Sequence, residues 1–189
     1  EFMDKWQKLG LAYDAIYSGF LADAGQIGVV LDAISRFAGK DTLVVVDPAM
    51  ADDGKLYPVF KPDMVTEMKK LITAATVVTP NYTEACLLTD RPYENKPATT
   101  DELLSLCHSL ADMGPKQVVI TSVPSEEGAI RIACFDAREG TYTDYKVKRI
   151  PFATCGTGDL FTSVVTGSLL SGKSLAEAVK KAASFLSYA

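Results

Sequence analysis

The sequence predicts an α/β fold in which a doubly wound, mostly parallel sheet is flanked by helices. Short apolar strands alternate with amphipathic helices through the 189 residues. One of these strands, residues 42–46, is a continuous run of β-branched and leucine residues, which is typical of a parallel strand buried on both faces. No internal repeat or low-complexity linker interrupts the alternation, so residues 1–189 are expected to form a single domain.

The first part of the chain contains two helix and strand pairs. Apolar residues at helical spacing predict a short helix that ends at Gly10, followed by a strand at residues 13–17. Residues 23–37 place their apolar side chains on one face and are expected to be a helix. The buried strand 42–46 follows, and an Asp-Pro pair ends it.

The middle of the chain continues the pattern after a loop at residues 52–54. A proline suited to a first helical turn begins the helix expected over residues 62–75, and a strand at 76–79 ends at the next proline. Two further helices and a strand follow. These elements are expected at residues 81–88, 101–113 and 116–121.

In the last part of the chain, the alternation of strand and helix gives way to two consecutive strands. Residues 130–135 and 141–147 are two apolar-patterned runs separated by a short polar turn, which predicts a β-hairpin. One helix enters at Gly156 and another begins at Ser174. The chain starts at Glu1 and stops inside an apolar-periodic stretch, so we expect it to be part of a longer protein, incomplete at both ends.

Composition excludes several classes of protein. With 48% apolar and 23% charged residues, the chain does not have the composition of a disordered protein. It also has no run of about 18 uninterrupted apolar residues, so a membrane-spanning helix is not expected. Its 19 basic and 24 acidic residues give a net charge of −5, too negative and too evenly spread for a nucleic-acid-binding protein. No nucleic-acid or membrane partner is expected.

Cysteine and histidine usage removes further chemistry. Four cysteines separated by 21, 27 and 21 residues form neither a zinc ribbon nor a dense disulfide framework, so reduced thiols and a cytoplasmic location are expected. The single histidine, His108, lies within an amphipathic helix, where a structural or surface role is favoured. No GxSxG sequence accompanies it, which disfavours a serine hydrolase.

Gly156-Thr157-Gly158-Asp159 is the most informative local motif. Its glycines allow a ligand to approach the backbone, and the N–H groups at the start of the following apolar helix favour an anion such as a phosphate. Asp159 in the first turn could accept a proton from an attacking hydroxyl. The alternative is an ordinary glycine turn with an acidic residue that complements the helix dipole. The motif is neither a Walker A loop nor a Rossmann fingerprint, which disfavours a redox dinucleotide enzyme.

Four segments together make the sequence resemble the pyridoxal kinases of the ribokinase-like superfamily. They are residues 14–21, 45–50, 78–85 and 156–161. The resemblance implies ATP-dependent phosphorylation of the 5′-hydroxymethyl group of pyridoxal, pyridoxine or pyridoxamine. It also implies Mg²⁺, a monovalent cation such as K⁺, and a homodimer.

The same resemblance assigns roles to individual residues. Asp159 would be the catalytic base and would contact the substrate, while the backbone of Gly156, Thr157 and Gly158 would form an anion hole for the transferring phosphoryl group. The remaining residues would surround the nucleotide, its metal and the vitamin ring. Asp47 and Glu84 would lie near the phosphates and Mg²⁺ through water, Asp52 on the phosphate side, Thr79 and Thr121 along the nucleotide, and Phe20 against the pyridine ring.

Each of these roles has a structural alternative. Asp47 could simply close a strand, and Glu84 could be the capping-box partner of Asn81 at the start of a helix. Phe20 could be a core residue. Cys155, directly before the glycine motif, could have an activated thiol but is better explained as a small packed residue.

Two other functions stay open. A hydroxymethylpyrimidine kinase of the same superfamily acts on a similar hydroxymethyl heteroaromatic, although those enzymes often carry cysteine where Asp159 stands. A catalytically idle nucleotide-binding or scaffold fragment is the alternative from another class. Family members are longer at the N-terminus, where part of the vitamin pocket belongs, and their C-terminal helix near the adenine is longer.

Overall fold

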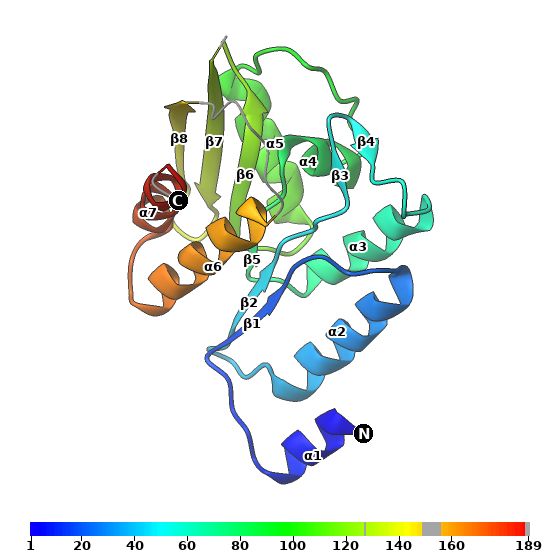
Figure 1. The fold of residues 1–189 in the computed structure, drawn as a ribbon. Coiled ribbons are helices and arrows are strands. Elements are labelled where there is room, and N and C mark those ends of the chain that lie inside the picture. The colour runs from blue at the N-terminus through cyan, green and yellow to red at the C-terminus, as the bar shows by residue number, and fades with distance from the viewer. Residues whose placement is uncertain (127, 149–155, 188–189) are drawn as a thin grey trace.

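The computed structural model describes residues 1–126, 128–148 and 156–187. Its six-stranded sheet has the order β1-β2-β5-β6-β7-β8 (Figure 1). The first four of these strands are parallel, and β7 and β8 continue the sheet in antiparallel pairing. The expected mostly parallel sheet and the hairpin near its end are confirmed. A separate two-stranded ribbon, β3-β4, was missed by the sequence reading.

The elements follow one another along the chain much as expected. The strands are β1 (Ala15–Ser18), β2 (Leu43–Val46), β3 (Ala51–Asp52), β4 (Lys55–Leu56), β5 (Val77–Val78), β6 (Gln117–Pro124), β7 (Ala129–Asp136) and β8 (Thr141–Lys148). The helices are α1 (Phe2–Lys8), α2 (Ala24–Phe37), α3 (Asp63–Thr73), α4 (Tyr82–Leu88), α5 (Thr100–Asp112), α6 (Thr157–Leu170) and α7 (Leu175–Leu186).

Helices cover both faces of the sheet. Helices α2 to α5 pack on one face over a large core that includes Val46, Met68 and Leu103. Helices α6 and α7 pack on the other, where Val119 of β6 contacts a second cluster with Phe161 and Val179. The connections between the parallel strands all place their helices on the same face of the sheet (Figure 1). The opposite face is therefore covered by the C-terminal helices α6 and α7.

The β6 strand is longer than its apolar run because its pairing with β7 resumes after an irregularity. The register shifts between Ile120 and Val123, and Ser122 in between has a φ of 53°. Such a shift lets the strand continue past its buried part. Periodicity cannot show this continuation, since residues 122–124 are not an apolar run.

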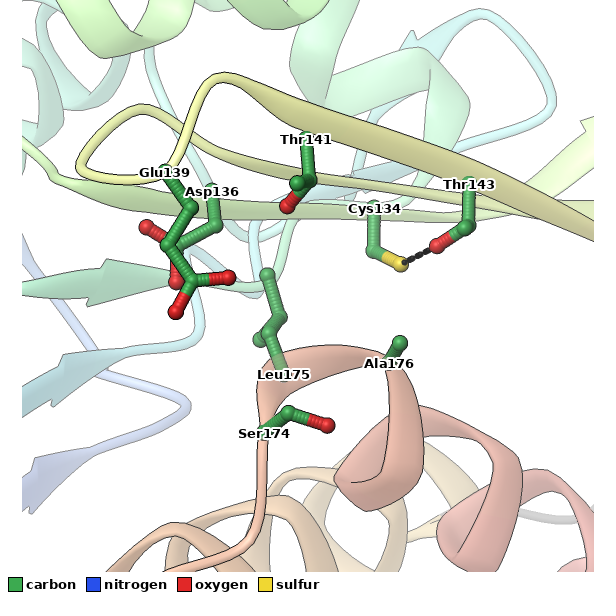
Figure 2. A pocket seen from close by; sticks show the side chains of 8 residues that line it. All are labelled: Cys134, Asp136, Glu139, Thr141, Thr143, Ser174, Leu175 and Ala176. Carbon is green, nitrogen blue, oxygen red and sulfur yellow. Dashed lines mark hydrogen bonds between the residues drawn. The ribbon is translucent and has the colours of Figure 1, made fainter.

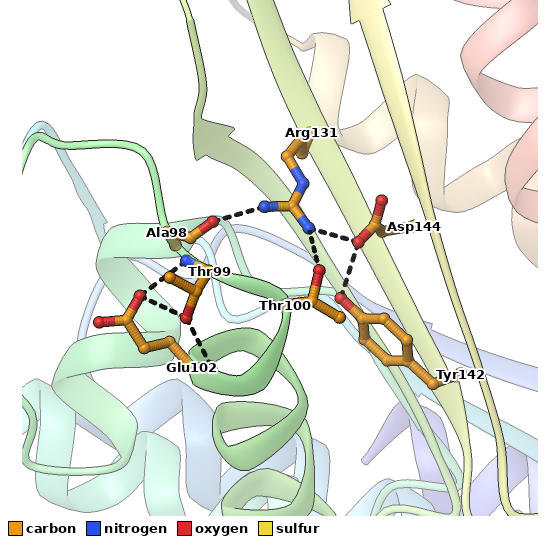
Figure 3. A network of polar contacts seen from close by, with 7 residues as sticks. All are labelled: Ala98, Thr99, Thr100, Glu102, Arg131, Tyr142 and Asp144. Atoms are coloured by element: carbon orange, nitrogen blue, oxygen red, sulfur yellow. Dashed lines mark hydrogen bonds and ion pairs between the residues drawn. The ribbon is translucent and has the colours of Figure 1, made fainter.

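Partly buried polar contacts attach the hairpin to the rest of the fold. Arg131 on β7 donates to the Ala98 carbonyl and to Asp144 on β8, and Tyr142 donates to the same Asp144 carboxylate at 3.1 Å (Figure 3). This connects both hairpin strands to the segment that precedes α5. The His108 ring packs on Phe135 at 4.5 Å between centroids, consistent with the expected structural role.

Candidate active site

The glycine motif forms a helix start at the carboxyl end of the parallel strands. Gly156 is the N-cap of α6 with a φ of 90°, a left-handed conformation that favours glycine. Leu160 N–H donates to the Gly156 carbonyl at 3.0 Å, so the N–H groups of the preceding turn point out of the helix end. The positive end of the 14-residue helix therefore faces outward here. This geometry suits the anion hole predicted for residues 156–158.

Asp159 lies in the exposed first turn of α6, and its carboxylate is held by a side chain of β1. The Tyr17 hydroxyl, at the end of β1, donates to Asp159 Oδ1 at 2.7 Å. Gly19 leaves the space for this contact, because a methyl group there would lie 2.7 Å from Asp159 Oδ1 and 2.9 Å from the Tyr17 hydroxyl. The predicted base is thus held by a residue 142 positions away in the sequence.

Gly19→Ala is expected to lower kcat strongly without unfolding the protein. The added methyl would meet only the ends of two side chains, which can move, so the contact between Tyr17 and the Asp159 carboxylate is what the change disturbs. A displacement of about 1 Å in a catalytic group can reduce the rate by about a hundredfold. Steady-state kinetics and thermal unfolding of the variant measure both effects.

Gly28→Ala is the matched control, since a methyl at Gly28 in α2 would meet no atom within 4 Å. That variant should keep its kcat. Equal activity of the two alanine variants would contradict the placement of Asp159 by Gly19.

Asp47 follows β2 and lies under the glycine motif. It is 7% exposed, and a methyl at Gly158 would lie 3.3 Å from its Oδ2 atom. Burial, with a smaller contribution from the negative charge of Asp159, raises the pKa of Asp47 to about 7. Two carboxylates near one helix start repel each other, and a cation would relieve that repulsion. Asp47 also closes its strand, which was the structural alternative: its N–H donates to the Ser18 carbonyl at 2.8 Å and so continues the hydrogen bonding between β1 and β2.

Glu84 has the capping role that the sequence left open. The carboxylate is 2% exposed and accepts N–H groups from Met50 at 3.0 Å, Ala51 at 3.3 Å and Asn81 at 2.8 Å. Together with the reverse bond from Glu84 N–H to Asn81, this makes a complete capping box. Burial and the charge of Asp47 raise the pKa of Glu84 to about 8. Glu84 therefore anchors the segment after Asp47 to α4, and its role near Mg²⁺ stays a prediction.

The two threonines predicted along the nucleotide lie on neighbouring strands: Thr79 directly follows β5, and Thr121 lies within β6 where its register with β7 shifts. Thr79 is 3% exposed, and its hydroxyl lies 3.0 Å from that of Thr162 on α6. Thr121 N–H donates to the Pro80 carbonyl at 2.9 Å. The first threonine thus lies beneath α6, whereas the second is half-buried. Their contact with a nucleotide stays a prediction.

The outer predicted residues are more exposed. Asp52 lies on the β3-β4 ribbon, where its carboxylate accepts the Asp53 N–H at 2.9 Å. Phe20 is 54% exposed and packs on Phe60 with ring centroids 5.4 Å apart, so the core-packing alternative does not describe it. Both could face a ligand. Cys155 lies outside the described residues.

A pocket of about 260 Å³ lies elsewhere, between the β7-β8 hairpin and the start of α7 (Figure 2). Asp136 on its wall pairs in register with Gln117, the first residue of β6. The pocket is therefore at the amino end of β6, at the opposite edge of the sheet from the Asp159 site. None of the residues predicted to be functional lines it.

Sequence reasoning missed Tyr17 and Thr162. Tyr17 was assigned only as the end of a strand, and Thr162 as part of an apolar helix. Two sequence signals point to these residues. Side chains alternate along a strand, so Tyr17 and Ser18 lie on opposite faces of β1. Asp159 and Thr162 are three residues apart, which places them on the same face of α6. Neither signal identifies the partner across the fold.

Comparison with known proteins supports the same reading of the fold. The family model described as phosphomethylpyrimidine kinase matches residues 9–189. A pyridoxine/pyridoxal/pyridoxamine kinase of Bordetella avium is 30% identical over 180 residues, which are 93% of this chain and 59% of that protein.

Two solved structures are also similar. A Bacteroides thetaiotaomicron protein, provisionally described as a phosphomethylpyrimidine kinase and crystallised with pyridoxal, is 41% identical with a TM-score of 0.93, and the match covers 97% of this chain and 65% of that one. The pyridoxal kinase of Staphylococcus aureus in complex with AMP-PCP is 27% identical with a TM-score of 0.75, over 95% of this chain and 65% of that one. The chain thus spans about three fifths to two thirds of the length of these relatives.

Proposed function

Because the chain belongs to the phosphomethylpyrimidine kinase family, we propose that it transfers the γ-phosphoryl group of ATP to the 5′-hydroxymethyl group of pyridoxal, pyridoxine or pyridoxamine. The observation that carries the proposal is the junction of Asp159 with an outward-facing helix start. Phosphoryl transfer needs a placed nucleophile and neutralised charge on the transferring group, and this junction supplies groups for both tasks. The relatives crystallised with pyridoxal and with AMP-PCP support the choice of substrates.

The chain's own residues divide the chemistry as follows. Asp159 accepts the proton of the substrate hydroxymethyl group as its oxygen attacks phosphorus, and the released ADP takes the electrons of the broken bond. Backbone N–H groups of residues 156–158 bind the phosphoryl oxygens, where charge develops. Phe20 offers an exposed ring beside this end of the sheet on which a pyridine ring could stack.

Mg²⁺ fits the acidic groups under the helix start. It prefers oxygen ligands and keeps several waters, and when bound it neutralises phosphate charge. Asp47 offers a buried carboxylate beside Gly158. Glu84 already accepts three backbone N–H groups, so we propose that both residues hold the ion through water. A monovalent cation such as K⁺ and a homodimer are proposed on the resemblance alone.

A cytoplasmic location is part of the proposal. Cys86, Cys107 and Cys134 are all free and buried in the described part of the chain, which is usual for a protein of a reducing compartment. Within the same residues, none of the helices has both the length and the apolar character needed to cross a bilayer.

The substrate is tested by a direct comparison. In the full-length protein with ATP and Mg²⁺, kcat/KM should be higher for pyridoxal than for hydroxymethylpyrimidine. The pyrimidine is the second candidate, because the matching family model is described as phosphomethylpyrimidine kinase. Faster phosphorylation of the pyrimidine would reject the choice of pyridoxal. Nucleotide binding with no turnover of either acceptor would instead favour the idle binding protein.

A further inference from the structure

We propose that Tyr17 is a positioning residue for the reaction: its hydroxyl fixes the orientation of the Asp159 carboxylate so that the second oxygen faces the acceptor alcohol. This inference rests on the proposed function, because it assigns a role within the same transfer step. Tyr17 lies in none of the groups that the sequence predicted to bind nucleotide, metal or vitamin.

The first support is the geometry of the contact. The Tyr17 hydroxyl lies 2.7 Å from Asp159 Oδ1, the distance of a well-formed O–H···O hydrogen bond. A carboxylate on an exposed helical turn otherwise rotates about its side-chain torsions. With Oδ1 occupied by the tyrosine, Oδ2 is the oxygen that accepts the proton of a substrate hydroxyl.

The second support is the direction of the hydrogen bond. Burial and the Asp159 carboxylate both raise the pKa of Tyr17, so the phenol stays protonated at physiological pH. The tyrosine is therefore always the donor and Asp159 the acceptor. A phenol that keeps its proton holds the base without competing for the proton that the base must accept.

The third support is the rigidity of the strand that carries the tyrosine. All four residues of β1 pair with β2, and Tyr17 is opposite Val45. A methyl on Gly19 would touch both the Tyr17 hydroxyl and Asp159 Oδ1, so the backbone there closes over the pair. The hydroxyl is held by the sheet, which makes it a fixed reference for a carboxylate on a helix.

A double-mutant cycle in the full-length protein tests the role. Tyr17→Phe should lower kcat between about tenfold and a hundredfold, the effect of losing one hydrogen bond to a charged group, with the KM for ATP unchanged. In an Asp159→Ala background the same change should have no further effect on the residual kcat, because no carboxylate remains to be oriented. A tyrosine that only stabilised the fold would reduce activity equally in both backgrounds.

Tyr13→Phe is the matched control. Tyr13 precedes β1 and packs edge-on against Phe37 with ring centroids 5.6 Å apart, and its variant should keep full activity. If the wild-type protein phosphorylates no B6 vitamer, the proposed function itself fails. If Asp159→Ala retains wild-type kcat, Asp159 is not the base, and the role of Tyr17 is overturned with it. If Asp159→Ala is inactive while Tyr17→Phe is fully active, more active, or additive with it, only the role of Tyr17 is overturned.

Discussion

Asp159→Asn is expected to reduce kcat by about a hundredfold to ten-thousandfold, the range usual for removal of a general base. Asparagine has nearly the same shape and can still accept the Tyr17 hydroxyl through its amide oxygen, so the fold and the Tyr17 contact survive. What is lost is the acceptor for the proton of the attacking alcohol. The measurement is kcat with saturating ATP and pyridoxal.

Nucleotide affinity is the companion measurement for this variant. The Asp159 carboxylate is not one of the groups assigned to hold the nucleotide, so the Kd for ATP measured by titration should stay close to that of the wild type. Loss of binding together with loss of turnover would mean that the substitution disturbs the helix start rather than the base. Unchanged turnover would remove Asp159 from the base role.

Glu84→Ala is expected to lower the free energy of unfolding by roughly 3–5 kcal/mol, because several buried N–H groups lose their acceptor at once. The donors come from Met50, Ala51 and Asn81, so the change removes part of the hydrogen bonding that joins the start of the β3-β4 ribbon to α4. Since small domains have only about 5–15 kcal/mol of stability, this single change would remove a large part of it. Denaturant unfolding measures the loss.

Glu102→Ala is a control of the same chemistry in a different environment. Glu102 closes an identical capping box with Thr99 at the start of α5 but is exposed, so water replaces the lost acceptor. Its variant should be only slightly destabilised. Similar losses for the two alanine variants would contradict the burial argument, and Glu84→Gln, which keeps one acceptor oxygen, should lie between them.

The fold was largely predictable because its signals are local. The pattern of apolar residues within a segment is enough to predict a buried strand at residues 42–46 and an amphipathic helix over residues 23–37. The structure has these elements as β2 and α2. The small β3-β4 ribbon could not be found this way. Each of its strands is two residues long, and it is held by Asn81 Nδ2, which donates to the Ala51 carbonyl at 2.7 Å from 30 positions away.

The candidate site was predictable as a set of strand ends but not as a set of contacts. Asp47 and Thr79 each directly follow a strand that the sequence predicts, and Asp159 follows a glycine motif that begins a helix, so the rule that parallel strands end together is enough to place them at one edge of the sheet. Which side chains meet there depends on how α6 crosses the sheet. That crossing brings Asp159 to Tyr17 on β1 and Thr162 to Thr79, and no local pattern encodes it.

Phosphoryl transfer to pyridoxal is tested most directly by identifying the phosphorylated product. With ATP, Mg²⁺ and pyridoxal, the full-length wild-type protein should form ADP and pyridoxal 5′-phosphate in equal amounts, as followed by chromatography and phosphorus NMR. Asp159→Asn should form almost none of either under the same conditions. ADP without phosphorylated pyridoxal, or equal product from both proteins, would contradict phosphoryl transfer to this vitamin by a base at the start of α6.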